Sequence, residues 1–297
     1  MKKNTCFLYG VGGVLIACAL SLLLVSCGGG GGGGSDDDDT PVSDFVAVPG
    51  ATFDGTAAIT GSGVFIAGRA VTIPSLLVCD HEVTQAEYQS VMGANPSNFS
   101  GTNKPVEQVS WYDALVYCNK RSLADGRTPC YKINGKTNPS EWGAVPTSSN
   151  STLNSVTCDF AANGYRLPTE AEWEYLARGG NLTNSGQTTY SGSNTIGSVA
   201  WYDDNGGSKT HEVKKKAANA LGLYDMSGNV WEWCWDWNGS ISTSTPSTGA
   251  ESGSNRVYRG GTWSGLAYIC AVSHRFSNSP LLRNYGVGFR VVCSRSE

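Results

Sequence analysis

The sequence predicts a loop-rich domain in which short helices and strands are separated by long irregular segments. Three observations support this prediction. Charged residues make up only 15% of the chain while glycine alone contributes 38 residues, a composition typical of turns and loops. Helix-capping signals occur at three separate places, and one run of alternating tryptophans indicates a strand.

The N-terminus has the pattern of an export signal. Met1-Lys2-Lys3 precedes an apolar run from Phe7 to Val25, and small residues follow. A transmembrane anchor is the alternative, but the run contains several glycines and lies at the very start of the chain. Leu24-Val25-Ser26-Cys27 looks like a bacterial lipobox. We therefore predict a lipoprotein signal peptide at residues 1–27, a lipidated Cys27 and no spanning helix.

Residues 28–44 are expected to form a flexible tether. An unbroken glycine run is followed by Asp36-Asp37-Asp38-Asp39, and neither part can bury enough apolar surface to fold. The acidic tract could also act as a sorting signal for export. The remaining residues, 45–297, are consistent with one domain of ordinary size.

Three helices are predicted from their caps. In each pair a hydroxyl residue stands three positions before a carboxylate, so that each side chain can satisfy a backbone donor of the first turn. The pairs are Thr84 with Glu87, Ser110 with Asp113, and Thr169 with Glu172. Glycines stand where these helices should end, at Gly93, Gly126 and Gly179.

A strand is predicted where tryptophan occupies every second position, at Trp231, Trp233, Trp235 and Trp237. This spacing places the four indoles on one face. A sugar-stacking surface is one interpretation, but we favour a core strand. Residues 132–155 and 238–255 are polar insertions and are expected to be loops.

Seven cysteines remain beyond the predicted signal peptide and Cys27, so at least one thiol is unpaired or pairs between molecules. Cys130 and Cys158 flank a polar insertion and are the first candidates for a disulfide. No cysteine spacing indicates a zinc site. The three histidines stand apart, and no acid–base pair can be nominated.

Near the end of the chain, two short motifs bracket a segment of different composition. Arg259-Gly260-Gly261-Thr262-Trp263 and Gly288-Phe289-Arg290-Val291-Val292, which we call the frame, bracket residues 264–287, which we call the tail segment. The tail segment has no Lys, Glu, Gln, Met or Trp and no helical or strand period. Such a pattern indicates a scaffold that presents a binding surface on loops.

Several collinear motifs resemble the formylglycine-generating-enzyme family over about residues 45–293. They are the frame, His81-Glu82-Val83-Thr84, and the stretches at residues 109–114, 164–175 and 222–233. The resemblance implies an α+β domain with the formylglycine-generating-enzyme subtype of the C-type lectin fold, irregular and loop-rich with short helices. The enzymes of the family bind copper through two thiolates and oxidise a substrate cysteine with dioxygen.

The resemblance does not extend to the copper pair. The two family cysteines align with Gly265 and Cys270, so only the second thiol is present. Two thiolates suit Cu(I), and one cannot form the two-sulfur site. We therefore expect no enzyme activity and no required cofactor. A divergent formylglycine-generating oxidase acting on sulfatase cysteines is the alternative.

A structural calcium ion is a further possibility that the family implies. The matching ligands are the side chains of Asp225 and Glu232 and the backbone carbonyls of Gly228 and Val230. The alternative is that both carboxylates make hydrogen bonds or ion pairs without metal.

The tail segment also resembles the variable region of diversity-generating retroelement variable proteins of the treponemal lipoprotein type. In that group adenine rewriting turns AAY codons into NNY codons, which cannot encode the five residue types missing here. The resemblance implies a variable region at about residues 256–292 that binds a ligand. The candidate contacts are Tyr258, Ser264, Gly265, Leu266, Tyr268, Ile269, His274, Phe276, Ser277, Asn278, Ser279, Leu281, Leu282, Asn284, Tyr285 and Gly286.

We therefore expect a ligand-binding lipoprotein displayed on the bacterial outer membrane or cell surface through its lipid anchor. A structural lipoprotein with an inert tail is a third possibility. The ligand is expected to be a protein or another surface macromolecule, and the protein is expected to be a monomer. Nucleic acid is not expected, because the only basic run is Lys214-Lys215-Lys216 and the net charge is -4.

Overall fold

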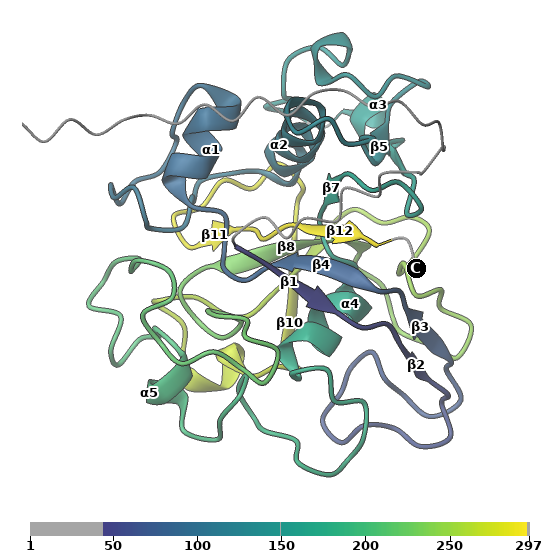
Figure 1. The fold of residues 1–297 in the computed structure, drawn as a ribbon, viewed down its shortest axis with the longest axis vertical. Coiled ribbons are helices and arrows are strands. Elements are labelled where there is room, and N and C mark those ends of the chain that lie inside the picture. The colour runs from purple at the N-terminus through teal and green to yellow at the C-terminus, as the bar shows by residue number, and fades with distance from the viewer. Residues whose placement is uncertain (1–43, 149, 296–297) are drawn as a thin grey trace, which may run out of the picture. The chain divides into compact units, whose positions relative to one another are not determined.

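Two four-stranded sheets lie at the centre of the computed structural model, which describes residues 44–148 and 150–295 (Figure 1). The first sheet is antiparallel and has the order β1-β4-β12-β7. Its strands are β1 (Phe45–Val48), β4 (Leu76–Cys79), β12 (Val292–Ser294) and β7 (Tyr165–Arg166). The first and last strands of the domain therefore lie in the same sheet.

The second sheet carries both ends of the tail segment. Its order is β10-β9-β8-β11, with β11 parallel to β8 and the other pairs antiparallel. The strands are β8 (Trp231–Trp237), β9 (Arg256–Arg259), β10 (Arg275–Asn278) and β11 (Val287–Gly288). Two small antiparallel pairs complete the strands: β2 (Ala51–Phe53) with β3 (Val71–Ile73), and β5 (Tyr131–Lys132) with β6 (Thr157–Cys158).

The three predicted helices are confirmed, and each begins with the predicted capping box. They are α1 (Gln85–Met92), α2 (Trp111–Ala124) and α4 (Glu170–Ala177). The predicted terminal glycines have positive φ angles that favour glycine, 80° at Gly93, 69° at Gly126 and 66° at Gly179. Four shorter pieces complete the helices: α3 (Ser151–Asn154), α5 (Ile196–Val199), and the 3₁₀ turns η1 (Pro139–Glu141) and η2 (Ala267–Cys270).

The tryptophan-rich strand β8 lies between two hydrophobic clusters. Trp231 and Trp233 pack in the cluster that also contains residues of α1 and α2, whereas Cys234 packs in the cluster that contains α4. The alternation of side chains along a strand explains how one strand serves two cores. The preferred interpretation of a core strand is therefore confirmed. The ring of Trp237 has the Arg256 guanidinium 3.3 Å from its centre, so this face is not open for a sugar.

All seven cysteines of the described residues are free, so the candidate disulfide between Cys130 and Cys158 is not formed. In the small β5–β6 pair, Cys158 stands opposite Tyr131 rather than Cys130. The thiol of Cys130 donates to the carbonyl oxygen of Gly164, at 3.3 Å.

The predicted signal peptide, Cys27 and the tether up to residue 43 lie outside the described residues. Among the residues that are described, no helix is both long and apolar enough to cross a membrane.

Candidate binding surface

Large apolar side chains that are exposed to solvent are concentrated in the tail segment. Five such side chains occur in the described part of the chain, and four of them lie between residues 264 and 287. Their exposed fractions are 56% for Leu266, 63% for Tyr268, 53% for Phe276 and 50% for Tyr285. The fifth is Leu123 on α2. Clusters of exposed apolar side chains usually mark interaction sites.

Phe276 and Tyr268 belong to one aromatic group that continues into the sheet. The ring centroid of Phe276 on β10 lies 5.7 Å from Tyr258 on β9 and 6.1 Å from Trp231 on β8. His274 lies between Tyr268, at 5.7 Å, and Trp231, at 6.0 Å. The exposed rings therefore rest on buried rings of the strands, which fixes their positions.

Tyr285 belongs to a second aromatic group at the other end of the tail segment. Its ring centroid lies 5.9 Å from that of the frame residue Trp263 and 6.3 Å from that of Phe99. Phe99 is partly buried and comes from the loop between α1 and α2, and it was not predicted as part of the surface. A lone aromatic residue in the polar stretch Asn95-Pro96-Ser97-Asn98-Phe99 was the only available sequence signal.

The side chain of the frame residue Arg259 binds the backbone of the tail segment. Its guanidinium is fully buried, pairs with Glu174 and lies 3.5 Å from Glu170, both on α4. The same guanidinium donates hydrogen bonds to the carbonyl oxygens of His274 and Val272. Charge-assisted bonds of this kind are among the stronger hydrogen bonds in proteins. The contacts do not depend on which side chain the tail residue carries.

The rest of the tail segment is held in the same way, by hydrogen bonds from the scaffold to main-chain oxygens. Such bonds are accepted by Gly265 from Asp203 N (3.0 Å), Cys270 from Ser227 Oγ (2.8 Å), Pro280 from Trp111 N (3.1 Å), Asn284 from Gln108 N (3.0 Å), Tyr285 from Trp263 Nε1 (3.2 Å) and Gly286 from Trp231 N (2.8 Å). The backbone of this segment is thus fixed while many of its side chains face solvent.

The candidate contacts fall into three groups by burial. Ser264, Leu266, Tyr268, Phe276 and Tyr285 are exposed. Ile269, His274, Ser277, Asn278, Ser279, Leu281, Leu282 and Asn284 are partly exposed, and Leu281 and Leu282 also pack against the first hydrophobic cluster. Tyr258, Gly265 and Gly286 are buried, so a direct contact role for these three is not supported.

Each buried candidate has a packing reason. Tyr258 makes edge contacts with Trp231 and Trp233 at 5.0 and 5.1 Å between ring centroids. A Cβ atom on Gly265 would lie 2.3 Å from Cδ1 of Ile269, because the Ile269 side chain fills that space. A Cβ atom on Gly286 would lie 2.6 Å from Oγ1 of Thr262. These positions support the surface from below.

In the candidate calcium loop, residues 225–232, the Glu232 carboxylate is paired with an arginine. Both oxygens of Glu232 are bound by the Arg290 guanidinium at 2.7 Å, and Trp173 Nε1 donates to one of them at 2.6 Å. Asp225 accepts from the backbone N of Lys214 through Oδ2, and its buried Oδ1 has no hydrogen-bond partner. Asp225 thus retains an oxygen for a cation, but a dication at Glu232 would face the arginine. The full ligand set of Asp225, Gly228, Val230 and Glu232 does not fit.

Burial controls the charge of the acidic groups around this loop. Desolvation raises the pKa of Asp225 to about 6, and the neighbouring carboxylate of Glu232 acts in the same direction. Desolvation also raises the pKa of Glu82 well above its usual range, with further contributions from Asp225 and Glu232. Glu82 accepts hydrogen bonds from Asn229 Nδ2 at 2.6 Å and Val230 N at 3.0 Å, which fixes the loop.

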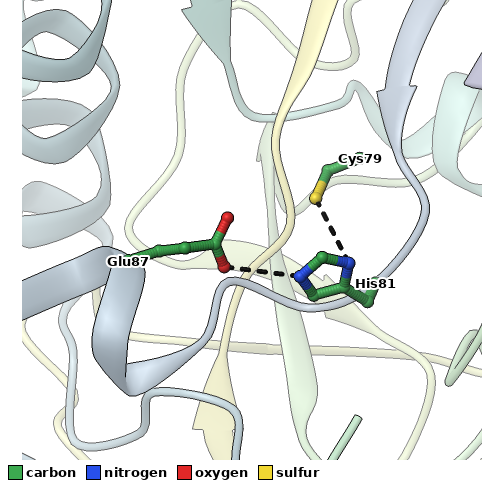
Figure 2. Close-up of side chains that lie close together, drawn as sticks. All are labelled: Cys79, His81 and Glu87. Atoms are coloured by element: carbon green, nitrogen blue, oxygen red, sulfur yellow. Dashed lines mark hydrogen bonds and ion pairs between the residues drawn. The ribbon is translucent and has the colours of Figure 1, made fainter. Parts of the chain in front are cut away.

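A second cluster with metal-binding residue types lies at the end of β4. Figure 2 shows Cys79 and Glu87 on different nitrogens of His81. The Cys79 Sγ lies 3.8 Å from Nδ1, and a carboxylate oxygen of Glu87 lies 3.4 Å from Nε2. Asp80 also binds Nδ1, at 2.5 Å. Burial would lower the pKa of His81, but hydrogen bonds to Asp80, Cys79 and Glu87 outweigh it and raise this pKa to about 12. Protonated His81 forms ion pairs with Asp80 and Glu87, and this network joins the end of β4 to α1.

The thiol of Cys270 is enclosed. Its side chain is buried, and a Cβ atom added to Gly261 would lie 2.6 Å from its sulfur. Desolvation raises the pKa of this thiol to about 12, which keeps it protonated at neutral pH. The tail segment thus offers a single enclosed thiol, whereas the two-sulfur copper site needs two.

Comparisons with known proteins agree with this fold. The structure is similar to that of Treponema denticola variable protein 1, with a TM-score of 0.75 and 39% identity, covering 84% of this chain and 95% of that one. This similarity confirms the predicted resemblance to variable proteins. Chaperone protein LppX of Paenibacillus barcinonensis is 40% identical over 69% of this chain and 75% of its own length.

A formylglycine-generating enzyme of Thermomonospora curvata is 36% identical over 70% of this chain, which spans 61% of the length of that enzyme. The family model of the sulfatase-modifying factor enzyme 1-like domain matches residues 34–295. The predicted α+β class and formylglycine-generating-enzyme subtype of the C-type lectin fold are thereby confirmed. The chain belongs to the sulfatase-modifying factor enzyme 1-like domain family.

Proposed function

We propose that this protein is a non-enzymatic binding protein whose tail segment forms a diversifiable surface on a constant scaffold. The observation that carries the proposal is the division between backbone and side chains in that segment. Its carbonyl groups are fixed by Arg259 and other scaffold residues, whereas four of its large apolar side chains are exposed. A surface built in this way can change its side chains and keep its shape.

The composition of the surface suits recognition of a macromolecule. Tyr268, Phe276 and Tyr285 supply rigid aromatic area, and Ser277, Asn278 and other small polar residues supply adaptable hydrogen bonds. Binding loops of antibodies combine the same residue types for the same reasons. A protein ligand is also in keeping with the relative that is named a chaperone.

Display on the bacterial surface follows from the N-terminal sequence. A lipidated Cys27 would hold the protein at the outer membrane or cell surface, and the glycine- and aspartate-rich tether would place the domain away from the lipid. Together these features would present the tail segment to external partners. We also propose that the protein is a monomer.

The divergent oxidase remains the second candidate because relatives with that activity match much of the chain. The site argues against it. Gly265 carries no thiol, and the thiol of Cys270 is buried with a raised pKa. The binding function needs neither residue as a reactive group.

The diversifiable surface is tested in the flanking DNA. We expect a near-copy of the coding region for residues 256–292 close to the gene, differing mainly at adenines, together with a reverse transcriptase gene. Codons for exposed positions such as Tyr268 and Phe276 should be the sites of difference, and codons for Arg259 and Arg290 should not. Absence of any template repeat would remove diversification from the proposal.

A further inference from the structure

β10 is the outermost strand of the second sheet and pairs on one side only. Its four residues, Arg275–Asn278, are in register with β9 from Arg259 to Arg256 without a bulge. Among the described residues, no segment other than β9 makes a backbone–backbone hydrogen bond to these four residues. The far edge of β10 therefore carries unpaired N–H and C=O groups, which can serve as a template for another strand.

Two of the usual protections of a strand edge, a proline and a bulge, are absent from β10. Proteins also limit pairing at such edges with charged side chains and by keeping the edge strand short. β10 has no proline, and its one charged residue, Arg275, points to α4, where two nitrogens bind the Glu170 carboxylate at 2.8 Å each. The side chain of Phe276 is exposed instead. The edge is thus unpaired, and it carries one exposed aromatic side chain.

The geometry points to an extended segment of another protein as the occupant, added to β10 as a further strand of the sheet. This inference rests on the proposed binding function and names the kind of ligand. Only an extended polypeptide presents alternating N–H and C=O groups at the spacing of a strand edge, which sugars and lipids do not. Backbone pairing also suits a surface whose side chains vary, because it is independent of side-chain identity.

Phe276 sets the side-chain preference of this partner. Its ring lies beside that of Tyr258, its cross-strand partner on β9. A residue of the added strand that pairs with Phe276 would extend this row of side chains across the sheet. The Cβ atoms of residues directly opposite each other on neighbouring strands are about 5 Å apart. The partner should therefore place an aromatic or β-branched residue opposite Phe276, with similar residues at alternate positions.

The test uses short linear peptides selected from a phage-displayed library on the full-length chain. Each selected peptide is then N-methylated at one position at a time, which removes one backbone donor and leaves the side chain. We expect affinity to fall about fivefold at alternate positions and to stay unchanged between them, since one hydrogen bond contributes about 1 kcal/mol. Amide hydrogen exchange of residues 275–278 should slow when peptide is bound.

Two variants separate this inference from the proposed function. Phe276→Ser should weaken peptide binding, and Leu123→Ser, which removes the exposed apolar side chain on α2, should not. If Phe276→Ser abolishes binding but N-methylation has no alternating effect, strand addition is wrong while the binding surface stands.

If peptide binding survives Phe276→Ser and the amides of residues 275–278 exchange no more slowly with peptide, both strand addition and the binding surface are wrong at this site. A library that yields no binding peptide also overturns strand addition. So does a dimer in light scattering whose β10 amides are protected without peptide, because the occupant would then be a second copy.

Discussion

Gly265 and Ile269 show that two positions of the tail segment constrain each other. The Ile269 side chain occupies the space that a side chain at Gly265 would need, with Cδ1 2.3 Å and Cγ1 2.8 Å from the added Cβ. The nearest backbone atom, the carbonyl oxygen of Thr262, is 3.1 Å away and leaves little room for movement. A larger residue at 265 therefore requires the Ile269 side chain to move or to be smaller.

We predict that Gly265→Ala lowers the free energy of unfolding by about 1–3 kcal/mol, the usual cost of overpacking. In the background of Ile269→Ala the same substitution should cost much less, because the clashing atoms are gone. Urea denaturation of the two single variants and the double variant gives the coupling energy. Additive effects would contradict the packing argument.

Asp236 gives a prediction for the dependence of stability on pH. Burial raises the pKa of its carboxyl to about 8, with nearby Glu170 acting in the same direction. Because the folded pKa lies above the unfolded value, the protonated form contributes stability that is complete below about pH 4. This contribution is lost as the pH rises towards 8.

In Asp236→Asn this loss should disappear, since asparagine can still accept the hydrogen bond from Glu170 N. We expect the free energy of unfolding of the variant to fall less than that of the original protein between pH 4 and pH 8, as measured by urea denaturation. Asp203→Asn, at an exposed site, serves as control and should keep the original slope. Equal slopes for all three proteins would show that Asp236 does not titrate in this range.

At the scale of elements, local chemistry determined what could be predicted from the sequence. The helices at Gln85, Trp111 and Glu170 were predictable because their capping pairs are adjacent in the chain. The burial of Gly286 was not, because it depends on Thr262, which is distant in sequence. Phe99 was missed for the same reason: its aromatic partners belong to the frame and the tail segment.

The tail segment and β8 should respond oppositely to truncation. Replacing Leu266, Tyr268, Phe276 and Tyr285 with Ser should change the melting temperature little, because these side chains are exposed. Trp233→Ala should cost about 3–5 kcal/mol, because the indole is fully buried. Thermal melts monitored by circular dichroism compare the two. If the tail substitutions are as damaging as Trp233→Ala, residues 264–287 belong to the core.

The loop from Asp225 to Glu232 should not need calcium. Because Arg290 occupies both oxygens of Glu232, we expect the same melting temperature in excess calcium and in chelator. A bound ligand at 100 times its dissociation constant would add about 2.7 kcal/mol to stability, which such a melt would detect. A calcium-dependent rise that Asp225→Asn abolishes would restore the metal site.

At the scale of the whole molecule, we expect the protein to keep the fold of an oxidase family and to lack oxidase activity. We predict that the purified protein, supplied with Cu(I), oxygen and a cysteine-containing sulfatase peptide, forms no formylglycine detectable by mass spectrometry. The reason is the combination of Gly265 with the buried, protonated thiol of Cys270. A formylglycine-generating enzyme assayed in parallel controls for the peptide, and turnover by this protein would favour the second candidate.

The hydrogen bonds from Arg259 to main-chain oxygens have a consequence for inheritance. A population of cells could carry many versions of this gene that differ only in the exposed side chains, and each version would meet the same guanidinium and the same carbonyls. Most new versions would then fold, so few cells would lose the protein when the sequence is rewritten. Under the proposed function, Arg259 would let the lineage change its binding partners while few variants fail to fold.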